Sequence, residues 1–211
     1  TFRRIIEEKT AILDIGGGSI QISLFDKDTL VSTQNLRLGV LRLQELLNHL
    51  NAGSTQMERL VDELATAQLD DYKKLYLKDR EIKNIIIVDD YLSPWAVRKA
   101  HERGEVNAVV DRKAFSQLME ALRTKGTTEL AKRMDIAEEK VPLVYTSAIL
   151  TRRIAELMGA ELVWAPGVTL CDGIAYEYAE QNKMFRGEHD FAEDIIACAL
   201  NISKRYNGSS K

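Results

Sequence analysis

Three consecutive glycines, residues 16–18, constrain the fold of this chain more than any other feature of its sequence. They follow residues 10–15, whose apolar run predicts a buried strand, and they precede residues 20–25, where apolar and polar side chains alternate. The glycines therefore form a tight turn between two strands. A simple hairpin would be satisfied by Asn-Gly, so three glycines indicate a turn that something must approach closely.

The chemistry of this turn suits a phosphate group. Without side chains, the backbone N–H groups of Gly16, Gly17 and Gly18 can approach an anion, and glycine tolerates the positive φ angles that we expect here. The hydroxyl of Ser19 adds a donor. Asp14, at the strand end, can hold a divalent cation such as Mg²⁺, directly or through water. We predict that the glycines and Ser19 bind phosphate and that Asp14 binds the metal.

Two other glycine-rich motifs do not fit the sequence. A dinucleotide-binding fingerprint needs a third spaced glycine where Gln21 stands, and it opens a helix, whereas a strand follows here. A P-loop needs Gly-Lys followed by Ser or Thr, which the turn lacks. A glycine-rich hairpin without a ligand stays open as the simpler alternative.

The remaining pattern predicts an α/β fold. Residues 30–36 add a third strand, so the first three strands form an antiparallel meander. Thr55 and Glu58 have the spacing of a capping box, with Thr55 as the N-cap of a long helix. We expect further strands at residues 85–88 and 161–164, and helices at residues 41–50, 55–78, 93–103, 111–125, 127–140, 141–158, 172–181 and 191–206.

Two motifs together resemble the Ppx/GppA family of exopolyphosphatases and guanosine pentaphosphate phosphohydrolases. One is the Asp-Ile-Gly-Gly-Gly-Ser turn, and the other is Asn-Leu-Arg-Leu-Gly-Val-Leu-Arg-Leu at residues 35–43. The resemblance implies an actin-like (ribonuclease H-like) ATPase-superfamily domain, with a mixed sheet, a three-stranded antiparallel meander and flanking helices. It matches the second of two domains, at residues 1–182. Residues 183–211 would be a helical tail at the start of a C-terminal helical domain, and the abrupt beginning suggests a piece of a longer protein.

The same resemblance implies a hydrolase of phosphoanhydride bonds. Such an enzyme releases terminal phosphate from polyphosphate or guanosine pentaphosphate with Mg²⁺. The catalytic base would come from the missing first domain, so we expect this chain alone to be inactive. Arg37 and Arg42 flank Gly39, and we predict that Arg37 contacts phosphate through a bidentate fork. An exposed strand-end arginine without a ligand is an equally good interpretation of Arg37.

The sequence departs from the family at three places. Gln21 stands where members carry a glutamate, Asp89 and Asp90 replace a second glycine-rich loop, and residues 167–173 keep only the last glycine of an Arg-Glu-Gly loop. Adjacent aspartates would repel a polyanion unless a cation intervened. A regulatory module that binds a phosphorylated ligand without turnover therefore stays open. A sugar or acetate kinase lobe is a third alternative, against which residues 37–43 argue.

Composition narrows the partners and the compartment. The net charge is −3 with both signs mixed along the chain, which argues against a nucleic-acid partner. No apolar run approaches the roughly 20 residues of a membrane helix. Two cysteines, Cys171 and Cys198, are too few for a disulfide framework; we expect buried thiols and a cytoplasmic protein. A homodimer through the exposed cleft face stays open.

Overall fold

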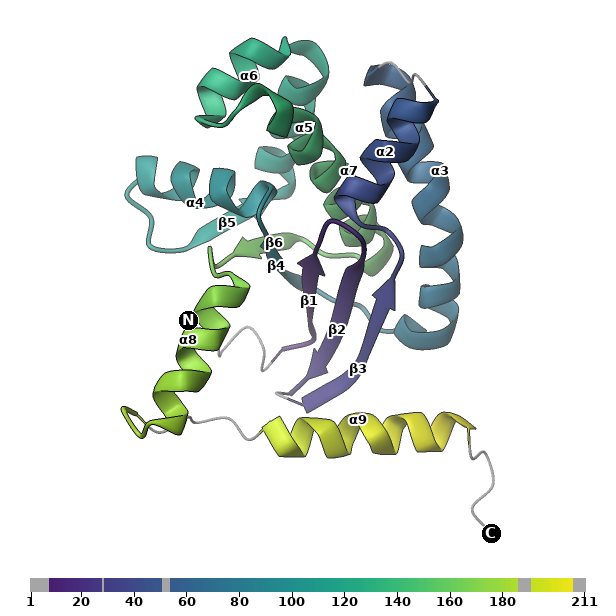
Figure 1. Ribbon diagram of the computed structural model, residues 1–211. Coiled ribbons are helices and arrows are strands. Elements are labelled where there is room, and N and C mark those ends of the chain that lie inside the picture. The colour runs from purple at the N-terminus through teal and green to yellow at the C-terminus, as the bar shows by residue number, and fades with distance from the viewer. Residues whose placement is uncertain (1–7, 28, 51–53, 186–190, 207–211) are drawn as a thin grey trace.

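Six strands form one mixed sheet at the centre of the molecule (Figure 1). The computed structural model describes residues 8–27, 29–50, 54–185 and 191–206. The strand order is β3-β2-β1-β4-β6-β5; β1, β4 and β6 run parallel, while β2, β3 and β5 pair antiparallel with their neighbours. The strands are β1 (Thr10–Ile15), β2 (Ile20–Asp26), β3 (Thr29–Leu36), β4 (Asn84–Asp89), β5 (Ala108–Asp111) and β6 (Leu162–Ala165). The mixed sheet with its antiparallel meander confirms the predicted fold class.

Helices flank this sheet, and α7 is the most deeply buried of them. Its middle turns, including Ala148, Ile149 and Leu150, are fully enclosed among α2, α3 and the sheet. The helices are α2 (Val40–His49), α3 (Ser54–Tyr72) with a π-helical turn (Lys73–Leu77), α4 (Leu92–Glu102), α5 (Arg112–Thr124), α6 (Thr127–Met134) with a 3₁₀ turn (Glu138–Lys140), α7 (Val141–Met158), α8 (Leu170–Gln181) and α9 (Phe191–Tyr206).

Buried and exposed side chains alternate along β1, so that one face of the strand packs in the core and the other carries a predicted site residue. Ala11, Leu13 and Ile15 are at most 2% exposed and enter the core, whereas Asp14 lies on the opposite face of the sheet and reaches solvent.

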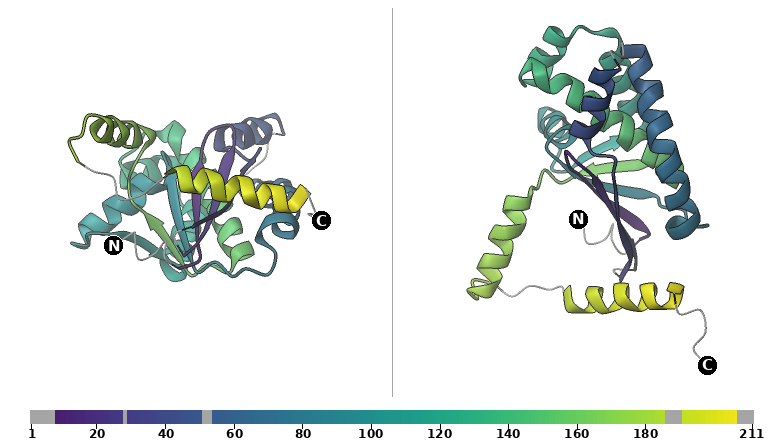
Figure 2. Two further views of the ribbon diagram at one scale, coloured as in Figure 1. Left: turned by 90° about the horizontal axis from the view of Figure 1, so that it is seen from below. Right: turned by 45° about the vertical axis from the view of Figure 1, so that its right-hand side comes forward.

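Figure 2 shows α8 standing clear of the sheet, and no residue of α8 is buried. Among the described residues, no helix combines the length and apolar composition needed to cross a bilayer.

Three local predictions were wrong. The strand β5 was missed because its four residues are too few to show alternation, and it forms only by pairing with the edge of β6. Thr55 is not an N-cap, because α3 already includes Ser54. Cys171 is exposed, since it lies in the first turn of the uncovered helix α8.

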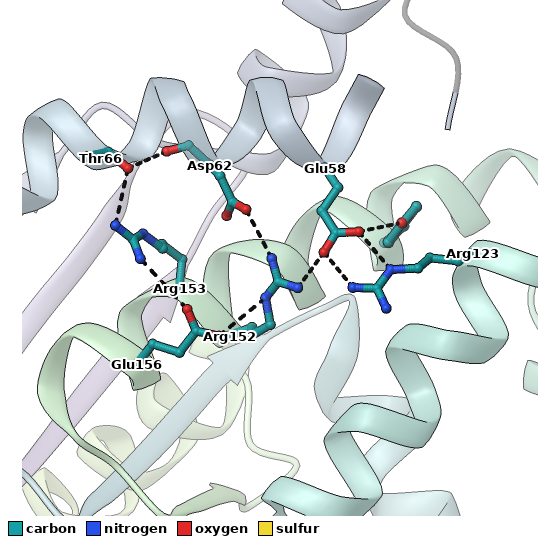
Figure 3. A network of polar contacts seen from close by, with 8 residues as sticks. Glu58, Asp62, Thr66, Arg123, Arg152, Arg153 and Glu156 are labelled. Atoms are coloured by element: carbon teal, nitrogen blue, oxygen red, sulfur yellow. Dashed lines mark hydrogen bonds and ion pairs between the residues drawn. The ribbon is translucent and has the colours of Figure 1, made fainter. Parts of the chain in front are cut away.

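Glu58, expected to complete the capping box, instead ties three helices together (Figure 3). From α3 it accepts hydrogen bonds from Arg123 of α5, at 2.8 Å from Nε and 2.7 Å from Nη2, and from Arg152 of α7. Arg152 also donates to Asp62 at 3.1 Å. The Arg123 hydrogen bonds, reinforced by Arg152, lower the pKa of Glu58 to about 2. This network fixes the helical layer that covers the sheet.

Replacing Glu58 by Gln is expected to lower the free energy of unfolding by roughly 2–4 kcal/mol at neutral pH, because two arginines lose their carboxylate. The folded-state pKa lies below the ordinary 4.5, so the stabilisation is complete above that pH and is lost as the pH falls toward 2. Urea unfolding across this range should therefore show the two proteins converging in acid.

The matched control is Glu63→Gln on the same helix. Among the described residues, Glu63 pairs only with the exposed Arg59 one turn away, at 3.5 Å, so its loss should change stability by less than about 0.5 kcal/mol. Equal effects of the two substitutions at neutral pH would contradict the role given to Glu58.

Candidate functional site

The glycine turn lies at the tip of the β1–β2 hairpin, against the first turn of α2 (Figure 1). The amide of Gly16 donates to the carbonyl of Ser19 at 2.9 Å and closes the turn. The pairing of Ile15 with Ile20 continues the ladder directly below it. The turn is thus held in place by the sheet from below and by a helix from the side.

All three glycine carbonyls face α2. The carbonyl of Gly16 accepts from the amide of Val40 at 3.0 Å, and that of Gly17 accepts from the amide of Arg42 at 3.1 Å. The carbonyl of Gly18 accepts from the side-chain Nε of Arg42 at 3.2 Å. Two of the amides that a helix leaves free at its start, those of Val40 and Arg42, are thereby satisfied by the turn.

This arrangement decides where the amides of the turn point. In a trans peptide unit the C=O and the N–H point in opposite directions, and the described chain has no cis peptide bond. Because the carbonyls of Gly16, Gly17 and Gly18 face α2, the N–H groups of Gly17, Gly18 and Ser19 point away from it. No hydrogen bond between described residues uses these three amides. These three consecutive amides can donate to an anion. The N–H of Gly16 cannot, because it donates to the carbonyl of Ser19 and closes the turn.

None of the three glycines is needed for a positive φ angle, and space is tightest at Gly17. The expected positive φ is absent, because among the described glycines only Gly104, Gly159 and Gly167 have one. A Cβ on Gly17 would lie 2.7 Å from Cδ1 of Leu41, and one on Gly18 would meet nothing within 4 Å. Gly18 thus leaves its peptide bare toward the outside, where a ligand would approach.

Gly39 completes the turn from the other motif, and sequence reasoning did not assign it to the site. A Cβ on Gly39 would lie 2.2 Å from the carbonyl oxygen of Gly17 and 2.3 Å from the amide nitrogen of Ser19. The backbones of the two motifs are therefore in direct contact. The sequence feature that could have assigned Gly39 to the site is its place at the centre of the motif at residues 35–43.

Substituting Gly39 by Ala is expected to push the turn away from α2, since backbone atoms stand where the methyl group must go. We expect a loss of about 2 kcal/mol in unfolding free energy and a loss of anion binding at the turn. Chemical unfolding measures the loss of stability, and amide spectra of the turn measure the loss of anion binding.

Gly173→Ala provides the control for Gly39→Ala. Gly173 lies in the exposed helix α8 with open space around its Cβ position, so alanine should be neutral or stabilising by up to about 1 kcal/mol. A Gly39→Ala protein as stable as the Gly173→Ala protein would show that the close contact is not needed.

Ser19 is oriented by a neighbour that the sequence did not reveal. The amide group of Asn35, on β3, donates to the hydroxyl oxygen of Ser19 at 3.2 Å. In the sheet register Asn35 pairs with Gln21, and Gln21 pairs with Asp14. These three polar side chains form one lateral row beneath the turn, on the face of the sheet opposite the core.

Asp14 lies beside a second carboxylate. Partial burial raises the pKa of Asp14, and the negative charge of Asp90, after β4, raises it further. Two neighbouring carboxylates fit a Mg²⁺ ion that keeps several waters and completes its shell with phosphate oxygens. No set of three or more His, Cys, Asp or Glu side chains within the described ranges is placed to hold a metal. The residues therefore suit a cation that arrives with its phosphate ligand.

Comparisons with known proteins identify the family. The model of the Ppx/GppA phosphatase family matches residues 3–182, which contain both motifs and the whole sheet. The chain belongs to the Ppx/GppA phosphatase family. Comparison with curated proteins found no relative.

Solved structures of Ppx/GppA proteins share the fold. A family member from Aquifex aeolicus matches with a TM-score of 0.67 and 11% identity, over 83% of this chain and 57% of that one. An exopolyphosphatase from Cytophaga hutchinsonii matches with a TM-score of 0.58 and 14% identity, over 78% of this chain and 58% of the other. The chain thus spans little more than half the length of these relatives.

One departure from the Ppx/GppA pattern has a structural explanation. Asp89 does not face the turn as a repelling charge, because it is only 7% exposed and both its oxygens are bonded. They accept from the amides of Leu92 and Ser93 at 2.8 and 2.7 Å, and from the hydroxyl of Ser147 at 2.8 Å. The Asp89 side chain thus satisfies the first amides of α4 and ties that helix to α7, and only Asp90 of the pair is exposed.

The two arginines beside Gly39 occupy different positions. Arg37 is exposed at the end of β3, where its backbone amide donates to Gln68 of α3 at 3.0 Å. Among the described residues, no hydrogen bond joins its guanidinium to the turn, and its role as a phosphate ligand stays a prediction. The arginine that contacts the turn is Arg42.

Proposed function

We propose that this chain is the phosphate-binding half of an exopolyphosphatase-type phosphohydrolase. The observation that carries the proposal is the row of N–H donors at Gly17, Gly18 and Ser19, set on the outer side of the turn by the contacts with α2. Three adjacent backbone donors and a hydroxyl match the oxygens of a terminal phosphate. The substrates that we propose are polyphosphate and guanosine pentaphosphate.

Each group has a separate task in this proposal. The three amides and the hydroxyl of Ser19 hold and orient the terminal phosphate. Asp14, with Asp90 beside it, would hold Mg²⁺, which neutralises phosphate charge when bound. Gln21, next to Asp14 in the register, can orient a water through its amide. Phosphoryl transfer depends chiefly on positioning and charge stabilisation, so this half of the site is rich in donors.

We further propose that the base that activates water lies outside this chain. A first domain facing the turn would supply it, which accords with the length of the structural relatives. The chain alone would then bind phosphate without hydrolysing it. Steady phosphate release from polyphosphate by these 211 residues would overturn this part of the proposal.

A second candidate function is a regulatory module that binds a phosphorylated ligand without turnover. It is favoured by Gln21, which is neutral where the family carries glutamate, and by Asp89, whose carboxylate is occupied by the first amides of α4. An intact two-domain protein that binds polyphosphate with Mg²⁺ but releases no phosphate would support this candidate. Release of phosphate would support the enzyme.

Binding of inorganic tripolyphosphate by the chain tests the shared core of both candidates. With Mg²⁺ present, we expect the largest ¹⁵N–¹H shifts at the amides of Gly17, Gly18 and Ser19. Asp14→Asn should weaken Mg²⁺-dependent binding roughly tenfold by removing one carboxylate from the cation. Asp71→Asn, an exposed carboxylate on α3, is the control and should bind as the unsubstituted chain does. Shifts confined to other regions would contradict the assignment.

A further inference from the structure

Of the three carbonyls that face α2, one is held in a different way from the others. The carbonyls of Gly16 and Gly17 accept from backbone amides of α2, which any residue except proline would supply. Gly18 accepts from a side chain, the Nε of Arg42 at 3.2 Å. The orientation of the Gly18–Ser19 peptide, and hence of the Ser19 N–H, therefore depends on the identity of residue 42.

We propose that Arg42 is a positioning residue that aims and strengthens the Ser19 N–H donor, an inference that rests on the proposed phosphate-binding function. Its guanidinium is on the α2 side of the peptide, whereas the Ser19 N–H points to the opposite side. Arg42 thus acts on a bound phosphate through the peptide and not by touching it. A cationic donor on the carbonyl also polarises the peptide unit, which makes its N–H a stronger donor.

Ser19 is in this way fixed from two directions. Arg42 holds the carbonyl that precedes its amide, and Asn35 donates to its hydroxyl at 3.2 Å. Both donors come from the segment that begins in β3 and enters α2, which is the second of the two family-like motifs. That motif therefore serves the phosphate site by orienting both donors of Ser19, its N–H and its hydroxyl.

The remaining contacts of Arg42 accord with this role. Its side chain is exposed, its backbone amide donates to Gly17, and no ion pair within the described ranges draws the guanidinium elsewhere. Arg37, two residues before Gly39, makes no such bond to the turn in the described structure. The two arginines, alike in sequence, are thus distinguished by which one bonds the Gly18 carbonyl.

Two substitutions of Arg42 distinguish a positioning role at the Gly18 carbonyl from a direct contact between its charge and phosphate. Arg42→Gln keeps an N–H donor at the same distance along the side chain as Nε but removes the charge. Arg42→Met keeps a side chain of similar length and removes both. We expect Arg42→Met to weaken tripolyphosphate binding roughly tenfold, about the value of one charged hydrogen bond, and Arg42→Gln to recover most of that loss. Arg59→Met, an exposed arginine of α3, is the control and should bind normally.

The outcomes separate this inference from the proposed function. Equal weakening by Gln and Met would indicate a direct charge contact, and unchanged binding in Arg42→Met would indicate no role; either result overturns the positioning role while leaving the phosphate site intact. If the unsubstituted chain binds no tripolyphosphate, the proposed function fails. In that case the positioning role of Arg42 is tested by amide spectra of the ligand-free protein. The Ser19 amide resonance should shift in Arg42→Met and stay unchanged in Arg42→Gln. The absence of that difference would overturn the positioning role.

Discussion

The contact between the glycine turn and the first turn of α2 is the interaction on which the site depends. It satisfies amides that α2 would otherwise leave free, and by the geometry of the peptide unit it turns the N–H groups of Gly17, Gly18 and Ser19 outward. The cost of this contact is steric, because Gly39 must approach the turn within a distance that no side chain permits. Two motifs separated in sequence thus form one structural unit.

The network around Glu58 supports this unit from behind. It links α3, α5 and α7, the helices that lie over or beside the core face of the sheet, and α7 in turn contacts α2. The hydroxyl of Ser147, also on α7, bonds Asp89 at the end of β4. The buried helix therefore couples the helical layer to the strand ends where the site lies. A family fold retained at 11–14% identity to its solved relatives is consistent with such non-local constraints.

Local patterns predicted most of the fold, and non-local contacts account for what they missed. Alternation and apolar runs located five strands, whereas β5 exists only through pairing with β6. The turn was identified from its glycines, but the tight space at Gly17 comes from Leu41, and the close backbone contact comes from Gly39, both more than 20 residues away. Arg37 and Arg42 are nearly equivalent in sequence, and only the start of α2 shows which of them bonds the turn. Asp89 looked like a surface charge because its partner Ser147 is 58 residues distant.

The central claim is that an outward row of backbone amides holds a phosphate. A crystal structure of the chain with tripolyphosphate and Mg²⁺ tests it most directly. The account predicts phosphate oxygens about 2.7–3.2 Å from the amide nitrogens of Gly17, Gly18 and Ser19. Tripolyphosphate bound at another surface, with these three amides facing solvent, would contradict it.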